Sequence, residues 1–135
     1  MNAFLTLCLA TMVGADPVPK LDAQERAVII EAARKALTRH FGAGTSPNKS
    51  DSIDAKHWGN DIAALKPIRV RNDHVNIAIV LSEKDGIEEG LYISNPISSY
   101  APKVGDRFTL LDRLGDPKER TFGHMYHYRL RTNAK

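Results

Sequence analysis

The sequence predicts an α+β fold in which a long N-terminal helix, followed by a short second helix, packs on a four- to five-stranded antiparallel sheet. Three observations carry this prediction. Apolar residues recur at helical spacing after a capping signal, the spacing changes to strict alternation after Pro67, and short turn signals separate the alternating segments. The chain has 135 residues, which suits one domain with one hydrophobic core.

The long helix is expected from Asp22 to Phe41. Asp22 and Glu25 have the spacing of a capping box, in which each side chain accepts a hydrogen bond from the other residue's backbone N–H. Gly42 is expected to end the helix in a left-handed conformation. The apolar stripe of the helix is formed by Ala27, Ile30, Ala33, Leu37 and Phe41.

A shorter helical pattern follows the polar loop 42–52 and ends before Pro67, because the residue before a proline avoids the helical conformation. One face of this pattern carries Ala55, Trp58, Ile62 and Leu65. We expect Trp58 to seal one end of the core. In the alternative interpretation, it caps the mouth of a pocket beside Gly59 and Asn60.

Alternation predicts strands over residues 68–71, 74–81, 87–93 and 107–114, and a last strand from residue 121 almost to the end. The second of these is apolar on both faces, which is typical of a central strand. Turns are expected at Asn72-Asp73 and at Glu83-Lys84-Asp85-Gly86, with Gly86 in the left-handed conformation. A helix followed by antiparallel strands is similar to the cystatin-like and nuclear-transport-factor-like arrangements, and this resemblance rests on the order of elements.

Residues 1–15 resemble a secretory signal peptide. They contain no charged side chain, and an apolar run ends in the small residues Val13-Gly14-Ala15. The run is shorter than the ~20 residues of a transmembrane helix, so we expect no membrane span in the mature chain. We therefore expect residues 16–135 to form one secreted or periplasmic domain. Cleavage would remove Cys8, the only cysteine.

The net charge of +3 is mildly basic, and acidic residues are interspersed with basic ones. A binder of nucleic acid or another anionic polymer usually carries a continuous basic surface. Here such a surface would need Arg69, Arg71, Arg129 and Arg131 on one face. Nucleic acid is therefore not the partner we expect.

The last strand carries the candidate acid–base residue. His124, Tyr126 and Tyr128 share one face of this strand, and His124 could act with a carboxylate, since histidine titrates near neutral pH. The carboxylate candidates are Asp61, Asp73 and Asp112. His127 points to the opposite face of the strand, so it cannot join His124 at one metal ion. We expect no metal site and no cofactor.

Two further segments are candidates for a role in binding. Glu88-Glu89 is expected to protect an edge strand by charge, with an acidic patch for a basic partner as the alternative. The uncharged loop 94–102 is rich in hydroxyl groups and contains two prolines. We expect it to be a simple connection that crosses the sheet, and among functional roles its composition favours recognition over catalysis.

The sequence favours a non-catalytic exported module that binds an unknown protein or small-molecule ligand, acting in the cell envelope. Its candidate binding residues are Trp58, Ile97, Ser98, Ser99, Tyr100, Tyr126 and Tyr128. The first alternative is a small pocket enzyme, a hydrolase or isomerase that uses His124. The second alternative is a binder of nucleic acid or another anionic polymer.

Overall fold

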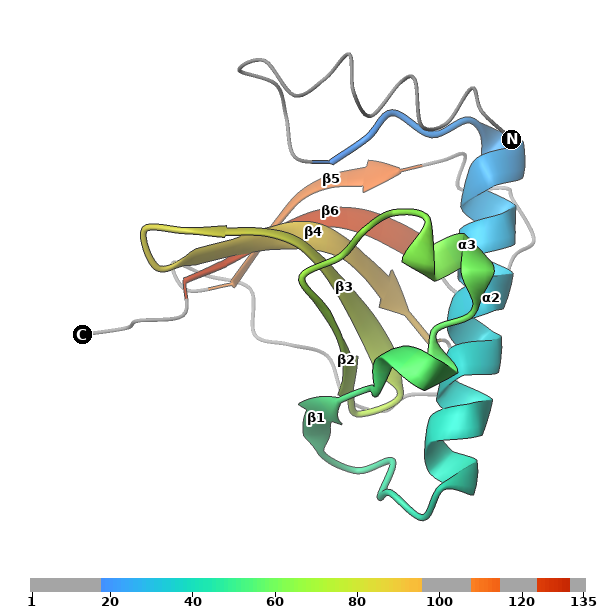
Figure 1. Ribbon diagram of the computed structural model, residues 1–135. Coiled ribbons are helices and arrows are strands. Elements are labelled where there is room, and N and C mark those ends of the chain that lie inside the picture. The colour runs from blue at the N-terminus through green and yellow to red at the C-terminus, as the bar shows by residue number, and fades with distance from the viewer. Residues whose placement is uncertain (1–17, 96–107, 115–123, 132–135) are drawn as a thin grey trace.

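The computed structural model describes residues 18–95, 108–114 and 124–131 (Figure 1). Their order confirms the predicted α+β fold. The helices are α2 (Ala23–Gly42), the 3₁₀ helix η1 (Ala55–His57) and α3 (Asn60–Ala63). The strands are β1 (Ser50–Ser52), β2 (Arg69–Asp73), β3 (Asn76–Lys84), β4 (Ile87–Ser94), β5 (Phe108–Leu114) and β6 (His124–Arg131).

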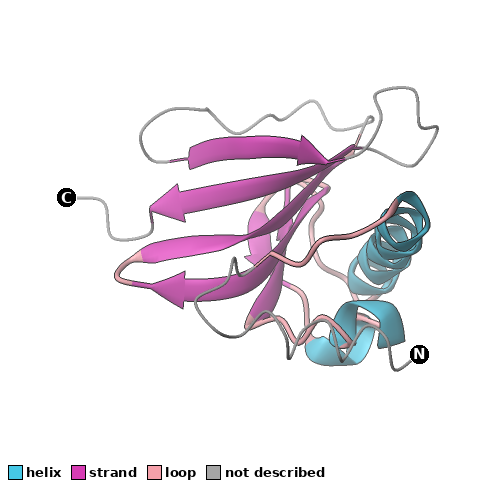
Figure 2. Ribbon diagram, turned by 90° about the horizontal axis from the view of Figure 1, so that it is seen from above, coloured by secondary structure: helices cyan, strands magenta, loops and turns pink. Residues whose placement is uncertain are grey.

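The strands form one antiparallel sheet in the order β1-β2-β3-β4-β6-β5. The five longer strands agree with the predicted number, and the three-residue β1 adds a short edge that the sequence did not indicate. The helices lie on one side of the sheet (Figure 2). The β3–β4 hairpin extends away from α2 (Figure 1). The molecule therefore has a helix side and an opposite face.

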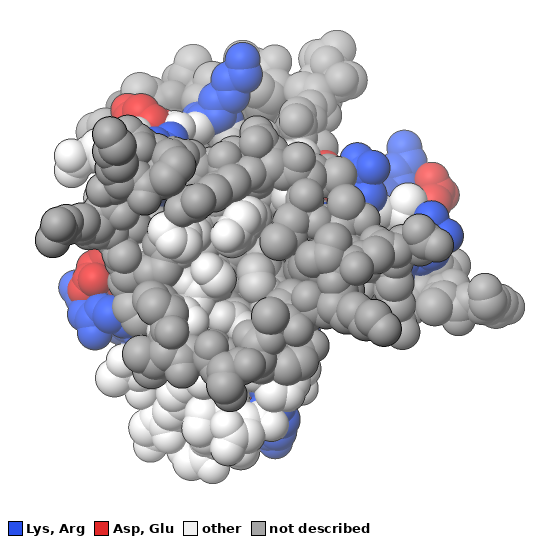
Figure 3. Space-filling model, turned by 180° about the vertical axis from the view of Figure 1, so that it is seen from behind, with Lys and Arg blue, Asp and Glu red and all other residues white. Residues whose placement is uncertain are grey.

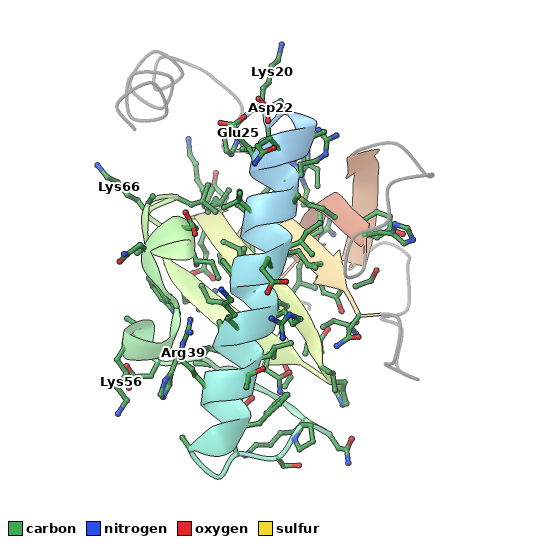
Figure 4. The ribbon with its side chains drawn as sticks, turned by 90° about the vertical axis from the view of Figure 1, so that its right-hand side faces the viewer. Lys20, Asp22, Glu25, Arg39, Lys56 and Lys66 are labelled. Carbon is green, nitrogen blue, oxygen red and sulfur yellow. The ribbon has the colours of Figure 1, made fainter. Side chains whose placement is uncertain are left out.

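The predicted capping box is present at the start of α2. The backbone N–H of Glu25 donates to Asp22 Oδ1 at 2.8 Å, and the backbone N–H of Asp22 donates to Glu25 Oε1 at 2.9 Å (Figure 4). These two bonds satisfy N–H groups that a helix leaves without partners at its start. The helix side of the sheet then buries the apolar stripe of α2, namely Ile29, Ile30, Ala32, Ala33, Ala36 and Leu37.

The end of α2 differs from the prediction. Gly42 belongs to the helix, and Ala43 follows with φ −83° while its N–H bonds to the carbonyls of the last turn. The left-handed residue is Gly44, at φ +97°. The prediction for Gly42 was wrong because either glycine can supply this conformation, and the sequence does not say which one does.

The second helical pattern is divided at Gly59. This residue has φ +82°, which interrupts the helix and separates η1 from α3. The predicted face still points to the core. Ile62 and Leu65 are buried, and Trp58 is partly buried against the same cluster.

The turn between β2 and β3 lies two residues later than predicted. Asn72 and Asp73 belong to β2, and the turn is formed by His74 and Val75, with φ of +54° and +76°. A β-branched residue rarely adopts positive φ. Here the Asn72 side chain accepts a hydrogen bond of 2.9 Å from the Val75 N–H and holds the turn. The next turn is shorter than predicted, because Glu83 and Lys84 belong to β3; Gly86 has positive φ as predicted, and Asp85 has positive φ as well.

Strand β4 is an interior strand that pairs with β3 and β6. The prediction that Glu88-Glu89 protects an edge was therefore wrong. Gly90 lies beside an irregularity of the β3–β4 register, and a Cβ atom at this residue would be 2.0 Å from the carbonyl oxygen of Ile79. Only glycine allows this close approach of two backbones.

Candidate functional site

A groove of about 430 Å³ runs between α2 and the segment that contains η1 and the start of α3. We call it the Trp58 groove. Its residues from α2 are Ala27, Val28, Glu31, Ala32, Lys35 and Arg39, and its residues from the facing segment are Trp58, Gly59, Asn60 and Asp61. The volume lies in the range of ligand pockets in proteins.

Trp58 forms a fixed wall of the Trp58 groove. Its indole Nε1–H donates to the carbonyl of Ile53 at 2.9 Å, which orients the ring. The side chain also packs against the hydrophobic core. The ring therefore contacts the core and also lines a groove beside Gly59 and Asn60, and a binding role for Trp58 stays a prediction.

Arg39 is held in place on the facing wall. Its Nε–H donates to the carbonyl of His57 at 2.9 Å. Its Nη2 atom is 3.1 Å from the position that a Cβ atom would occupy at Gly59. Figure 4 shows Arg39 extending from α2 toward η1, whereas Lys56 points away. Nε is used in this bond, and within the described part of the chain the two Nη groups have no hydrogen-bond partner, while Arg39 is one of the residues that line the groove.

The other charged side chains of the Trp58 groove differ in their pairing. Glu31 is bound by two nitrogens of Arg34, and this hydrogen bonding, followed by the positive charge of Arg34, lowers the pKa of Glu31. Lys35 lies one turn before Arg39, on the same side of α2. Asp61 belongs to the first turn of α3. The groove thus combines an apolar floor, an aromatic wall and charges of both signs.

The opposite face of the sheet carries a second group of polar and aromatic side chains, which we call the tyrosine face: Asp73, Tyr92, Tyr126, Tyr128 and Glu88. Tyr92 is paired in register with Tyr126, and the rings of Tyr92 and Tyr128 meet edge to face with centroids 5.8 Å apart. Tyr92 donates its hydroxyl proton to Asp73 at 2.7 Å. Tyr92 and Tyr128 are buried, and Tyr126 is partly buried.

Glu88 is the centre of the tyrosine face and is only 1% exposed. Its carboxylate accepts hydrogen bonds from Arg69 at 2.9 Å, from Arg71 at 3.0 Å and from the Tyr128 hydroxyl at 2.7 Å. Burial raises the pKa of Glu88, but the bonds and charges of Arg71, Tyr128 and Arg69 outweigh it and leave the pKa below its ordinary value. Burial and the Glu88 charge raise the pKa of Tyr128. These groups stabilise one another.

The histidines of β6 lie on opposite sides of the sheet, as expected. His124 is exposed and is paired in register with Ser94. His127 lies on the helix side, where its Nε2 contacts Glu89, and Arg129 is 3.5 Å from the same carboxylate. Sequence reasoning singled out His124, yet the close histidine–carboxylate contact belongs to His127.

The predicted carboxylate partners of His124 lie elsewhere or are described by backbone alone. Asp61 lines the Trp58 groove on the helix side. Asp73 binds Tyr92, and its other oxygen is 3.2 Å from His74 Nδ1. Asp112 is part of β5, of which the structure describes the backbone.

Four of the predicted binding residues belong to a segment that the structure does not describe, namely Ile97, Ser98, Ser99 and Tyr100. Among the described residues, no group of three or more metal-binding side chains is found. Neither α2 nor any other helix in the described part has the length and hydropathy needed to cross a membrane.

The four arginines proposed for a basic surface do not share a face. Arg69 and Arg71 lie on the tyrosine face and are bound to Glu88, whereas Arg129 is on the helix side beside Glu89. The described basic and acidic side chains lie largely next to one another in Figure 3. This arrangement counts against the polymer-binding alternative.

Sequence reasoning missed Lys35 and Arg39 as residues of a groove. The available signal was their four-residue spacing, which places both on one side of a helix. Which side of α2 would face η1 could not be read from that spacing. The chain was also compared with protein-family models, curated proteins and solved structures, and none of them matches it.

Proposed function

We propose that this protein is a non-catalytic exported module that binds a protein or small-molecule ligand in the Trp58 groove. The observation that supports this most is the combination of a fixed indole, an apolar floor and an oriented guanidinium in one groove. Binding sites commonly join an apolar lining to a few placed polar groups. Fixing the side chains in advance also lowers the entropy lost on binding.

The tyrosine face is the competing location. Its charged groups already bind one another, since Glu88 is shared by two arginines and Tyr128. A ligand would have to replace these buried bonds, which costs more than filling an open groove. For this reason we place the binding site on the helix side.

The experiment uses a library of acetylated random pentapeptides with free carboxyl ends, screened for binding to residues 16–135. Selected peptides should bind Trp58→Leu at least tenfold more weakly. The matched control is Tyr126→Leu, which truncates a partly buried aromatic residue on the opposite face. Peptides that bind Trp58→Leu normally but fail to bind Tyr126→Leu would indicate a site on the tyrosine face and contradict the proposal.

A further inference from the structure

The Trp58 groove is long enough for an extended peptide. Its α2 residues run from Ala27 to Arg39, and a rise of 1.5 Å per residue makes this about 18 Å. An extended chain covers ~3.5 Å per residue, so about five residues fit along the helix. The groove is partly open to solvent, as a peptide site requires.

The two ends of the groove differ in charge. Toward the start of α2, Glu31 is neutralised by Arg34. Toward the end of α2, Lys35 and Arg39 both line the groove, and the Nη2 atom of Arg39 lies beside Gly59. A guanidinium fork of this kind matches the two oxygens of a carboxylate. The positive charge is therefore concentrated where the groove reaches its last helical residue.

We infer that the Trp58 groove recognises the C-terminal end of a peptide, with an apolar side chain against Trp58 and Ala32 and the terminal carboxylate on Arg39. The inference rests on the proposed function and adds the chemical class of the ligand. A chain that runs in the same direction as α2 ends at Arg39, and in this direction its terminal carboxylate meets the guanidinium. Asp61, on the facing segment, remains available to backbone N–H groups of the peptide.

The test compares the best peptides of the library in two forms, with a free carboxyl end and with a C-terminal amide. Isothermal titration calorimetry measures binding in the parent chain and in every variant, including Trp58→Leu, which has no tryptophan left to report by fluorescence. The free acid should bind about tenfold or more tightly than the amide, because charge-assisted hydrogen bonds are lost in the amide. Arg39→Gln should remove this preference. Lys56→Gln, an exposed cation that points away from the groove, should leave it unchanged.

Arg39→Lys keeps the positive charge but removes the planar guanidinium group, so this variant should keep part of the preference for the free acid over the amide. Thermal unfolding of each variant must match the parent chain, which the exposure of Arg39 leads us to expect. Equal affinity for acid and amide, or a preference that survives in Arg39→Gln, would overturn the carboxylate inference. If the binding of both the free acid and the amide still depended on Trp58, the proposed function would stand and only the carboxylate inference would fall. Binding that is independent of Trp58 would overturn both.

Discussion

The hydroxyl of Tyr128 donates a hydrogen bond of 2.7 Å to Glu88, and neither side chain reaches solvent. The bond joins β6 to β4, where Glu88 is also held by Arg69 and Arg71 from β2. Three strands are thus connected through one carboxylate on the face opposite the helix.

Tyr128→Phe should lower the free energy of unfolding by about 1–3 kcal/mol, because the buried carboxylate loses one donor without gaining water. Urea denaturation at neutral pH measures this change. Tyr126→Phe is the matched control, because Tyr126 lies in β6 like Tyr128, is paired with Tyr92 of β4 and is partly exposed. Its effect should stay within about 0.5 kcal/mol. Equal losses in the two variants would show that the Tyr128–Glu88 bond contributes nothing specific.

Glu88 should make the free energy of unfolding depend on pH in the acidic range. Its pKa is below the ordinary value in the folded chain, so the unfolded chain binds the proton more readily. The stabilisation is present above the unfolded pKa of about 4.3 and is lost as pH falls through the lowered folded pKa. Urea midpoints at pH 7 and pH 3 should therefore differ strongly in the parent chain.

Glu88→Gln should be less stable at pH 7 by about 3–5 kcal/mol, because two arginines lose their buried partner. Its further loss at pH 3 should be smaller than that of the parent chain. Glu83→Gln also removes a partner of Arg69, but Glu83 is exposed and its substitution should change little. An acid sensitivity that is unchanged in Glu88→Gln would assign it to other groups.

Gly90→Ala should destabilise the protein by about 3 kcal/mol or more, since the added Cβ would lie 2.0 Å from the Ile79 carbonyl oxygen and strands β3 and β4 would have to separate. Gly42→Ala is the control. A Cβ atom at Gly42 meets nothing within 4 Å, and alanine favours the helix that contains it. Thermal unfolding of both variants should show a large loss for the first and none for the second. A tolerated Gly90→Ala would mean that β3 and β4 are not this close.

Mass spectrometry of the protein from its native host tests export. The mature chain should begin at or near Asp16 and should lack Cys8, as expected for cleavage after Ala15. An intact Met1 in a cytoplasmic fraction would contradict the secreted or periplasmic location.

Much of the fold could be predicted from local patterns. The capping box of Asp22 and Glu25, the left-handed conformation of Gly86 and the alternating faces of β6 depend on neighbours in sequence, and all three are confirmed. Met125 faces the helix side and Tyr128 faces away, as the alternation requires.

The rest depends on contacts between distant segments. Val75 adopts positive φ because Asn72 and Asn95 hold the turn, and β-branched residues give no local sign of this. Strand β6 pairs with β4, which makes Glu88 and Glu89 interior residues and brings His127 to Glu89. Arg71 reaches Glu88 from β2, on the other side of β4. The Trp58 groove likewise requires that Arg39 meet residues nearly twenty positions later.

The central claim is that the Trp58 groove is the binding site, and mapping of backbone amide chemical shifts tests it most directly. A ¹⁵N-labelled chain titrated with the best library peptide should show its largest shifts along α2 from Ala27 to Arg39 and over Trp58 to Asp61. Shifts that instead concentrate on β4 and β6 around Tyr92 and Tyr126, with α2 unchanged, would contradict the account.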